Sequence, residues 1–301
     1  MFSRFNLDTR YDNYCVMGNP ISHSLSPQIH AAFAEQTGQM LHYQAIRVES
    51  GEFAEAVERF YKAGGKGINV TIPFKQEAWA LVEKRSQRAE LAGAVNTLGF
   101  DQAGCHYGDN TDGIGFVRDY LNNHGGSIKG RRILVLGAGG AVRGVLGPIL
   151  EEHPAQLAIA NRTLAKASEL RDLFAKQGEI EVYAYEDLAL HRFDLIINGT
   201  AASLEGQLPP LPEANLAQGS HCYDMMYAPE PTPFIQWGYA HGAVRSIDGL
   251  GMLVEQAAEA FFLWRDVKPD TQPVIERLRL RNRIASEIPK SNPPLKEGDQ
   301  R

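Results

Sequence analysis

Cysteine is scarce in this chain of 301 residues, where it occurs three times, far apart and in no spacing that binds a metal. Because Cys15, Cys105 and Cys222 are odd in number, they cannot all pair within one chain. No other grouping of histidine, cysteine and acidic residues suggests a metal site. We expect three reduced thiols, as in a cytoplasmic protein, and no metal.

Long apolar runs and an excess of basic residues are also missing. No segment has the length of about 20 apolar residues that crosses a bilayer, and residues 1–13 lack the apolar core of a signal peptide. The formal net charge of −6 argues against a general nucleic-acid binder, which needs a basic face. We expect a cytoplasmic protein that binds a small molecule and neither nucleic acid nor membrane.

Strand and helix patterns alternate along most of the chain. The first part contains expected strands 14–18, 42–48 and 68–72, helices 26–38, 52–65 and 73–85, and a hairpin over 95–109. The second part contains helices 112–124, 141–151 and 164–177 and strands 133–137, 157–161, 181–185, 194–199, 221–227 and 244–248. This alternation predicts an α/β fold with largely parallel sheets.

Two domains are expected from this order. Residues 1–111 form an N-terminal α/β substrate-binding domain, which the helix 250–280, with its first part at 250–265, completes by packing back on it. Residues 112–249 form a dinucleotide-binding domain of the Rossmann type. Residues 281–301, rich in proline and charge, are expected to be a disordered tail.

A glycine-rich turn, GAGGAVRG (137–144), follows an apolar strand and opens a helix. In that context Gly137 permits a tight turn, Gly139 lets a pyrophosphate approach the backbone, and the helix N-terminus supplies N–H donors. Val142 occupies a position that is normally glycine or alanine. The pattern favours a dinucleotide site over an ordinary tight turn.

An acidic residue is absent where NAD-binding proteins hold the ribose hydroxyls, about twenty residues further on. The sequence there is Asn161-Arg162-Thr163. A guanidinium grips a 2′-phosphate, which a carboxylate would repel, so NADP is the expected cofactor. The alternative is that Arg162 is only a residue at a helix start, with its guanidinium group in solvent.

Four segments of the first domain carry polar side chains at strand ends or helix starts. These side chains are Ser24 and Ser26, then Asn69, Thr71 and Lys75, then Asn96, and finally Asp109, Asn110 and Asp112. Hydroxyls, amides and a lysine–aspartate pair suit a small, polyhydroxylated carboxylate. Each residue could instead be a helix cap or a turn residue, and the sequence does not show that the segments converge.

Lys75 is the unusual member of this group. If Pro73 opens a helix, the lysine lies in the first turn, where the macrodipole disfavours a cation. Gln256 is a second oddity, because it lies on the apolar stripe of its helix and needs a partner. A bound hydroxyl or a backbone group would serve equally.

The chain resembles shikimate dehydrogenase, the NADPH-dependent reductase of the shikimate pathway, from about Tyr14 to Leu278. The motifs that carry the resemblance are GNPISHSLSPQIH, NVTIPFK, AGAVNT, GDNTDG, GAGGAVRG, NRT, CYDMMY and DGLGMLVEQAA. It implies reversible reduction of 3-dehydroshikimate to shikimate in aromatic amino acid (chorismate) biosynthesis. The state of assembly is expected to be a monomer or a homodimer.

The resemblance also implies a role for individual residues. Lys75 and Asp112 would be the catalytic pair. Substrate contacts would come from Ser24, Ser26, Asn69, Thr71, Asn96, Tyr227 and Gln256. Cofactor contacts would come from Gly137, Ala138, Gly139, Gly140, Ala141, Asn161, Arg162, Thr163, Met225 and Gly249.

Val142 and the segment 200–203 depart from the family pattern, both on the cofactor side. Two other functions stay open: a shikimate/quinate dehydrogenase of broader specificity, and a sensor that binds NADP or a metabolite without turnover. The presence of both Lys75 and Asp112 argues against the sensor, which needs no proton-transfer pair.

Overall fold

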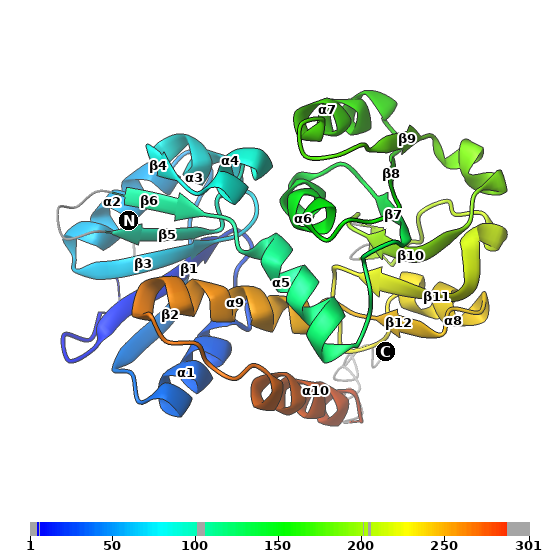
Figure 1. The fold of residues 1–301 in the computed structure, drawn as a ribbon. Helices are drawn as coiled ribbons and strands as arrows, with labels where there is room; N and C mark the ends of the chain where they lie inside the picture. The colour runs from blue at the N-terminus through cyan, green and yellow to red at the C-terminus, as the bar shows by residue number, and fades with distance from the viewer. Residues whose placement is uncertain (1–4, 6, 101–105, 201, 204–205, 288–301) are drawn as a thin grey trace, which may run out of the picture.

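A computed structural model of the chain describes residues 5, 7–100, 106–200, 202–203 and 206–287, with side chains as far as Arg281. These residues form two α/β units that lie next to each other, joined by helices α5 and α9 (Figure 1). Each unit contains a six-stranded sheet covered by helices. The predicted α/β class is therefore confirmed.

The first unit contains a mixed sheet in the strand order β2-β1-β3-β5-β6-β4. Its strands are β1 Asp12–Gly18, β2 Leu41–Arg47, β3 Gly65–Val70, β4 Lys84–Arg85, β5 Thr97–Phe100 and β6 His106–Asp109. Its helices are α1 Ser26–Thr37, α2 Phe53–Lys62, α3 Lys75–Leu81 and α4 Gln87–Ala92. Strand β1 runs parallel to both neighbours, whereas β5 and β6 form the predicted hairpin and pair antiparallel.

The second unit contains a fully parallel sheet in the order β9-β8-β7-β10-β11-β12, the 3-2-1-4-5-6 order of dinucleotide-binding folds. Its strands are β7 Arg132–Leu136, β8 Gln156–Ala160, β9 Glu181–Tyr183, β10 Phe193–Asn198, β11 Leu216–Asp224 and β12 Arg245–Ile247. Its helices are α6 Gly140–Glu151, α7 Leu164–Phe174, α8 Pro233–Ala240 and the short turns η2 Tyr185–Leu190 and η4 Glu213–Asn215. The predicted Rossmann-type topology is confirmed.

Two helical segments run between the units. The first is α5 Asp112–Arg118, which continues as a π-helical turn, η1 Asp119–Asn123. The second is α9 Leu250–Arg265, followed by α10 Gln272–Glu287. Leu250, Val254 and Phe261 of α9 belong to the apolar cluster of the first unit, so this late helix packs back on the first sheet.

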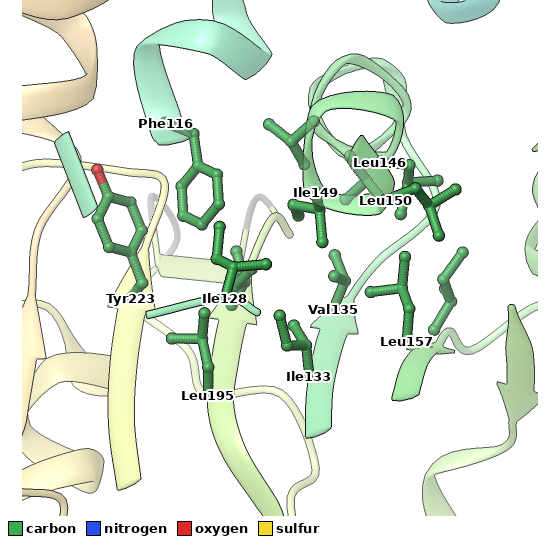
Figure 2. Close-up of a cluster of buried hydrophobic side chains, with 14 of the residues drawn as sticks. Phe116, Ile128, Ile133, Val135, Leu146, Ile149, Leu150, Leu157, Leu195 and Tyr223 are labelled. Atoms are coloured by element: carbon green, nitrogen blue, oxygen red, sulfur yellow. The ribbon is translucent and has the colours of Figure 1, made fainter. Parts of the chain in front are cut away.

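The central strand of the second unit, β7, is buried because helices cover both faces of its sheet. Its Ile133 and Val135 belong to a cluster with Ile149 of α6 (Figure 2). Phe116 of α5 meets Tyr223 of β11 edge to face, with ring centroids 4.9 Å apart. The helix that begins at Asp112 is thereby anchored in the core of the cofactor-type unit.

Three predictions about helices are wrong. The helix expected over 73–85 ends at Leu81, because residues 84–85 pair with β6. The segment 250–280 is two helices, since Asp266 ends α9 with a left-handed backbone (φ 55°). A disordered tail was expected from residue 281, but α10 continues to Glu287. Residues 288–301 lie outside the described residues.

Two of the three cysteines lie in these cores. Cys15 and Cys222 are free and fully buried, and burial raises the pKa of both thiols, that of Cys222 to about 12. Cys105 lies outside the described residues. The two buried thiols therefore serve as small apolar core residues.

We expect His30 of α1 to make the folded protein sensitive to acid. Its side chain is fully buried, with the ring stacked on that of Tyr43 at 4.1 Å. Burial lowers the pKa of His30 to about 3 from an ordinary 6.5. Between these values only the unfolded chain binds the proton, so stability falls as the pH falls.

We expect His30→Phe to flatten the pH dependence of unfolding between pH 6 and pH 5. The wild-type free energy of unfolding should fall more steeply than that of the variant, by about 1.4 kcal/mol per pH unit. Urea unfolding at both pH values measures this difference. Equal slopes in the two proteins would show that His30 does not titrate between the folded and unfolded states.

Candidate active site

Lys75 is the first residue of α3, and its ammonium lies 2.5 Å from the Oδ2 atom of Asp112. Asp112 is the first residue of α5, where a carboxylate is favoured by the macrodipole. Both side chains are largely buried, with exposed fractions of 22% and 10%. The cation that is unfavourable at its own helix start is thus balanced by a carboxylate from the start of another helix.

Asn96 fixes the second oxygen of that carboxylate. Its Nδ2 group donates to Asp112 Oδ1 at 2.8 Å and to Thr111 Oγ1 at 2.9 Å. Its own Oδ1 accepts the backbone N–H of Thr111 at 2.9 Å. Asn96 is buried, so these bonds act in a medium of low dielectric constant. With Lys75 on Oδ2 and Asn96 on Oδ1, the carboxylate has one defined orientation.

Gln256 approaches the same cluster from α9. Its Nε2 group donates to the carbonyl oxygen of Leu253 at 2.8 Å, and its Oε1 accepts from Asn96 and Thr111 at 3.3 Å. The sequence left open whether a bound hydroxyl or a backbone group pairs with Gln256, and the structure shows a backbone group. Helix α9 can lie this close to α5 because residue 115 is glycine. A Cβ atom there would lie 2.8 Å from the backbone nitrogen of Gln256.

Asn69 lies beside this cluster on β3. Its Oδ1 accepts the hydroxyl of Tyr43 at 2.7 Å, while its Nδ2 donates to the carbonyl of Asn96 at 3.2 Å. Thr71 follows the strand and is half-buried, with its backbone N–H donating to the carbonyl of Met17. Asn69 thus links Tyr43 to the backbone of Asn96, which directly precedes β5.

The two serines near the start of α1 do not cap the helix through their side chains. Leu25 is the cap residue, and no side-chain bond is made there. The backbone N–H of Ser26 donates to Ser24 Oγ at 3.3 Å. Ser26 is buried, whereas Ser24 and Tyr227 are half-buried, and Tyr227 packs against the apolar cluster shared by α1 and α9.

Asp109 is a polar candidate whose carboxylate pairs with an arginine. Its carboxylate receives a bidentate contact from Arg88, at 2.7 and 2.6 Å. Arg88 also contacts Glu259 of α9, which in turn pairs with Arg118 of α5. Asp109 therefore belongs to an ion-pair network that joins three helices to the sheet.

The glycine-rich turn is tight at its start and uncrowded at the start of α6. Gly137 has a φ of 100°, and a Cβ there would lie 3.3 Å from the carbonyl oxygen of Gly199. Gly139 caps α6, and a Cβ at Gly139 or Gly140 would meet no described atom within 4 Å. Ala138 is half-buried against the core, and Ala141 is exposed beside the opening. Free helix N–H donors therefore face open space.

The surroundings of Val142 explain why a larger residue occupies this normally small position. It is fully buried, and a Cβ at Gly199 would lie 2.4 Å from its Cγ2 atom. The valine thus fills the space over a glycine at the end of β10. In the segment 200–203, Ser203 donates to the buried carboxylate of Asp224 at 2.7 Å, while residue 201 lies outside the described residues.

The end of β8 forms a second opening. Asn161 donates through Nδ2 to the carbonyl of Thr163 at 2.8 Å, whereas Arg162 and Thr163 are exposed. Asn161 and Arg162 line a pocket of about 680 Å³, together with Leu164, residues 184–186 and residues 210–212. Among the described residues Arg162 makes no hydrogen bond or ion pair, so its guanidinium is available for a phosphate.

Met225 and Gly249 meet at the junction of β11 and α9. A Cβ atom at Gly249 would lie 2.3 Å from the carbonyl oxygen of Met225, so only glycine fits there. The N–H of Gly249 donates to the carbonyl of Met226 at 3.0 Å. Met225 is buried and belongs to the same apolar cluster as Ile133 and Val135. The two residues therefore lie in contact.

Three family descriptions match successive parts of the chain. They are the shikimate dehydrogenase substrate binding domain (residues 16–98), shikimate / quinate 5-dehydrogenase (120–206) and the shikimate 5'-dehydrogenase C-terminal domain (249–279). The shikimate dehydrogenase (NADP(+)) of Alkalilimnicola ehrlichii is 57% identical over 89% of this chain and 98% of its own length. The chain belongs to the shikimate dehydrogenase family.

Other members of the shikimate dehydrogenase family agree in sequence and in fold. The shikimate dehydrogenase (NADP(+)) of Nitrosococcus oceani is 58% identical over 89% of this chain and 95% of its own length. The structure of shikimate 5-dehydrogenase from Thermus thermophilus, in complex with NADP(H) and shikimate, matches with a TM-score of 0.80. It is 32% identical and covers 90% of this chain and 99% of that one.

Two residues that hold site candidates were not assigned to the site from the sequence. Tyr43 donates to Asn69, and Thr111 accepts from Asn96. Tyr43 is an ordinary member of an alternating strand, so no sequence signal marks it. Within the described parts of the chain no helix is long and apolar enough to cross a membrane, and no group of three metal-binding side chains occurs.

Proposed function

We propose that Lys75 and Asp112 are the catalytic pair of an NADP-dependent shikimate dehydrogenase. The enzyme interconverts 3-dehydroshikimate and shikimate in aromatic amino acid (chorismate) biosynthesis. The observation that carries the assignment is the 2.5 Å contact between the ammonium of Lys75 and Asp112, whose other oxygen is held by Asn96. An exposed lysine would lack such a fixed direction.

The cofactor, when bound, supplies a hydride to the carbonyl carbon of the substrate ring. Negative charge then develops on the carbonyl oxygen, and Lys75 donates the proton that this oxygen takes up. Asp112 orients the ammonium before the transfer and shares the hydroxyl network of the substrate. In the reverse direction the amine of Lys75 accepts the proton from the hydroxyl of shikimate.

The remaining polar side chains are proposed to bind the substrate. Ser24, Ser26 and Tyr227 take its carboxylate, because hydroxyl groups at a helix start offer donors to an anion. Asn69, Thr71, Asn96 and Gln256 contact the ring hydroxyls and the keto group. The half-buried state of Ser24, Thr71 and Tyr227 is consistent with this role, since each retains access to a ligand.

The cofactor is proposed to lie along the glycine-rich turn and the end of β8. Its diphosphate binds at residues 137–141, and its 2′-phosphate binds at Asn161, Arg162 and Thr163. Met225 and Gly249 border the nicotinamide. The open space over Gly139 and Gly140 supports the first part, and the unpaired guanidinium of Arg162 supports the second.

We also propose the domain limits and the cellular setting. Residues 1–111, with the helical segment that starts at residue 250, form the substrate domain, and residues 112–249 form the NADP domain. The protein works in the cytoplasm as a monomer or homodimer, without nucleic-acid or membrane partners. A shikimate/quinate dehydrogenase of broader specificity stays the alternative, because one matching family description names both compounds.

Asp112→Asn tests the catalytic pair. The amide keeps the shape of the carboxylate but leaves the ammonium of Lys75 without its counter-charge, so kcat should fall by about 10²- to 10³-fold. Steady-state oxidation of shikimate measures this, with exposed Asp187→Asn as the matched control. A variant that turns over within twofold of the wild type would remove Asp112 from the mechanism.

A further inference from the structure

Arg143 lies in the first turn of α6, the helix whose N-terminus is open for a diphosphate. This turn contains no acidic residue, so no side chain of the turn offsets the positive charge of the macrodipole, the free N–H groups and the arginine. The positive end of a helix is an unfavourable position for an arginine without a counter-charge. An anion bound at this position would therefore be stabilised.

Lys75 provides the comparison within the same protein. It also stands in the first turn of a helix, and there the carboxylate of Asp112 lies 2.5 Å away. Arg143 has no such partner, since it forms no hydrogen bond or ion pair with any residue that the structure describes. Its Nε atom is buried and unpaired. One of the two first-turn cations is balanced by the protein, and the other is not.

The guanidinium of Arg143 reaches out of the cofactor unit to the substrate unit. A Cβ atom at Gly93 would lie 2.7 Å from its Nη2 atom and 2.8 Å from its Cζ atom. Gly93 ends α4 and begins the loop that leads to Asn96. In that loop the N–H of Val95 donates to the carbonyl of Lys75 at 2.8 Å. Arg143 therefore contacts the loop that supports both members of the catalytic cluster.

We propose that Arg143 binds the diphosphate of the cofactor and joins that diphosphate to the loop of residues 93–96. Guanidinium groups bind phosphate oxygens through paired N–H donors, and an anion at the start of α6 would compensate the unbalanced charge. The inference rests on the proposed cofactor site, to which it adds a side-chain ligand. Because NADP and NAD share the diphosphate, Arg143 contributes to affinity and Arg162 to the choice between them.

Binding of NADP⁺, NAD⁺ and adenosine 2′-monophosphate to Arg143→Gln tests the proposal by calorimetry, without substrate or turnover. NADP⁺ and NAD⁺ should both bind more weakly by about the same factor, tenfold to a hundredfold. Adenosine 2′-monophosphate, which lacks the diphosphate, should bind as it does to the wild type. Arg143→Lys should recover part of the loss, and exposed Arg131→Gln should show none.

An unchanged affinity for NADP⁺, or a loss confined to NADP⁺, would overturn the proposal. The unfolding midpoint of the cofactor-free variant should stay at or above that of the wild type, because the substitution removes an unbalanced cation. If Arg143→Gln lowers that midpoint, the comparison rests on Arg143→Lys, which must bind both dinucleotides more weakly than the wild type. A wild type that binds NADP⁺ but does not oxidise shikimate would contradict the proposed reaction and leave this inference standing.

Discussion

Replacing Lys75 with methionine should lower kcat for shikimate oxidation by about 10³-fold. Methionine has a similar length but cannot exchange a proton or carry charge, so the oxygen of the substrate loses its acid–base partner. KM for shikimate should change far less, because other side chains hold the carboxylate and hydroxyls. Steady-state kinetics with saturating NADP⁺ separates the two effects.

Two further variants show whether Lys75 acts as a proton donor or only as a positive charge. Lys75→Arg retains the charge but remains protonated, so it should stay far below the wild type if proton transfer is required. Lys66→Met makes the same substitution at an exposed position of β3 and should leave turnover unchanged. Near-full turnover in Lys75→Met would remove the residue from the chemistry.

Replacing Arg162 with glutamine should weaken the preference for NADP over NAD by about tenfold to a hundredfold. The exposed guanidinium has no partner among the described residues, and a charge-assisted bond to the 2′-phosphate is the interaction lost. KM should rise for NADPH and stay the same for NADH, which has no 2′-phosphate. Steady-state assays with both reduced cofactors measure the ratio.

Arg171→Gln is the matched control for this prediction. Arg171 is an exposed residue of α7, paired only with its neighbour Asp172. Its removal should leave both KM values unchanged. If Arg162→Gln kept the full NADPH/NADH ratio, the 2′-phosphate would have to be held by other groups at the end of β8.

The sequence pattern was sufficient for most of the second unit, because most of its signals are local. The apolar strand β7, the glycine turn and the start of α6 are contiguous, and parallel strands buried on both faces read as continuous apolar runs. Helix α8 was missed, although Thr232 caps it and Pro233 begins it, both recognised start signals.

The first unit was harder to predict where distant segments decide the local structure. The helical pattern continues past Leu81, yet Lys84 and Arg85 form a strand beside β6. No residue near Lys84 in the sequence predicts this strand. The helix of residues 87–92 follows a cap at Ser86, whose hydroxyl accepts from Ala89. Long-range pairing here overrides the local pattern.

The active-site pair was named from the family resemblance, but its geometry depends on contacts that no sequence pattern contains. Asp112 meets Lys75 because two glycines let α5 pack closely. A Cβ at Gly113 would lie 2.4 Å from the carbonyl of Gly144, and one at Gly115 would strike Gln256. The sequence predicted a helix that contains both glycines, but it did not show which neighbours they let approach.

The rate of NADPH formation with shikimate, with quinate and without substrate, repeated with NAD⁺, tests the central claim most directly. We predict rapid, shikimate-dependent reduction of NADP⁺, no reduction without substrate, and much slower reduction of NAD⁺ at the same concentration. Turnover of quinate at a comparable rate would favour the shikimate/quinate alternative. A folded, NADP⁺-binding protein that forms no NADPH from shikimate would contradict the assignment of Lys75 and Asp112 as a catalytic pair for this reaction.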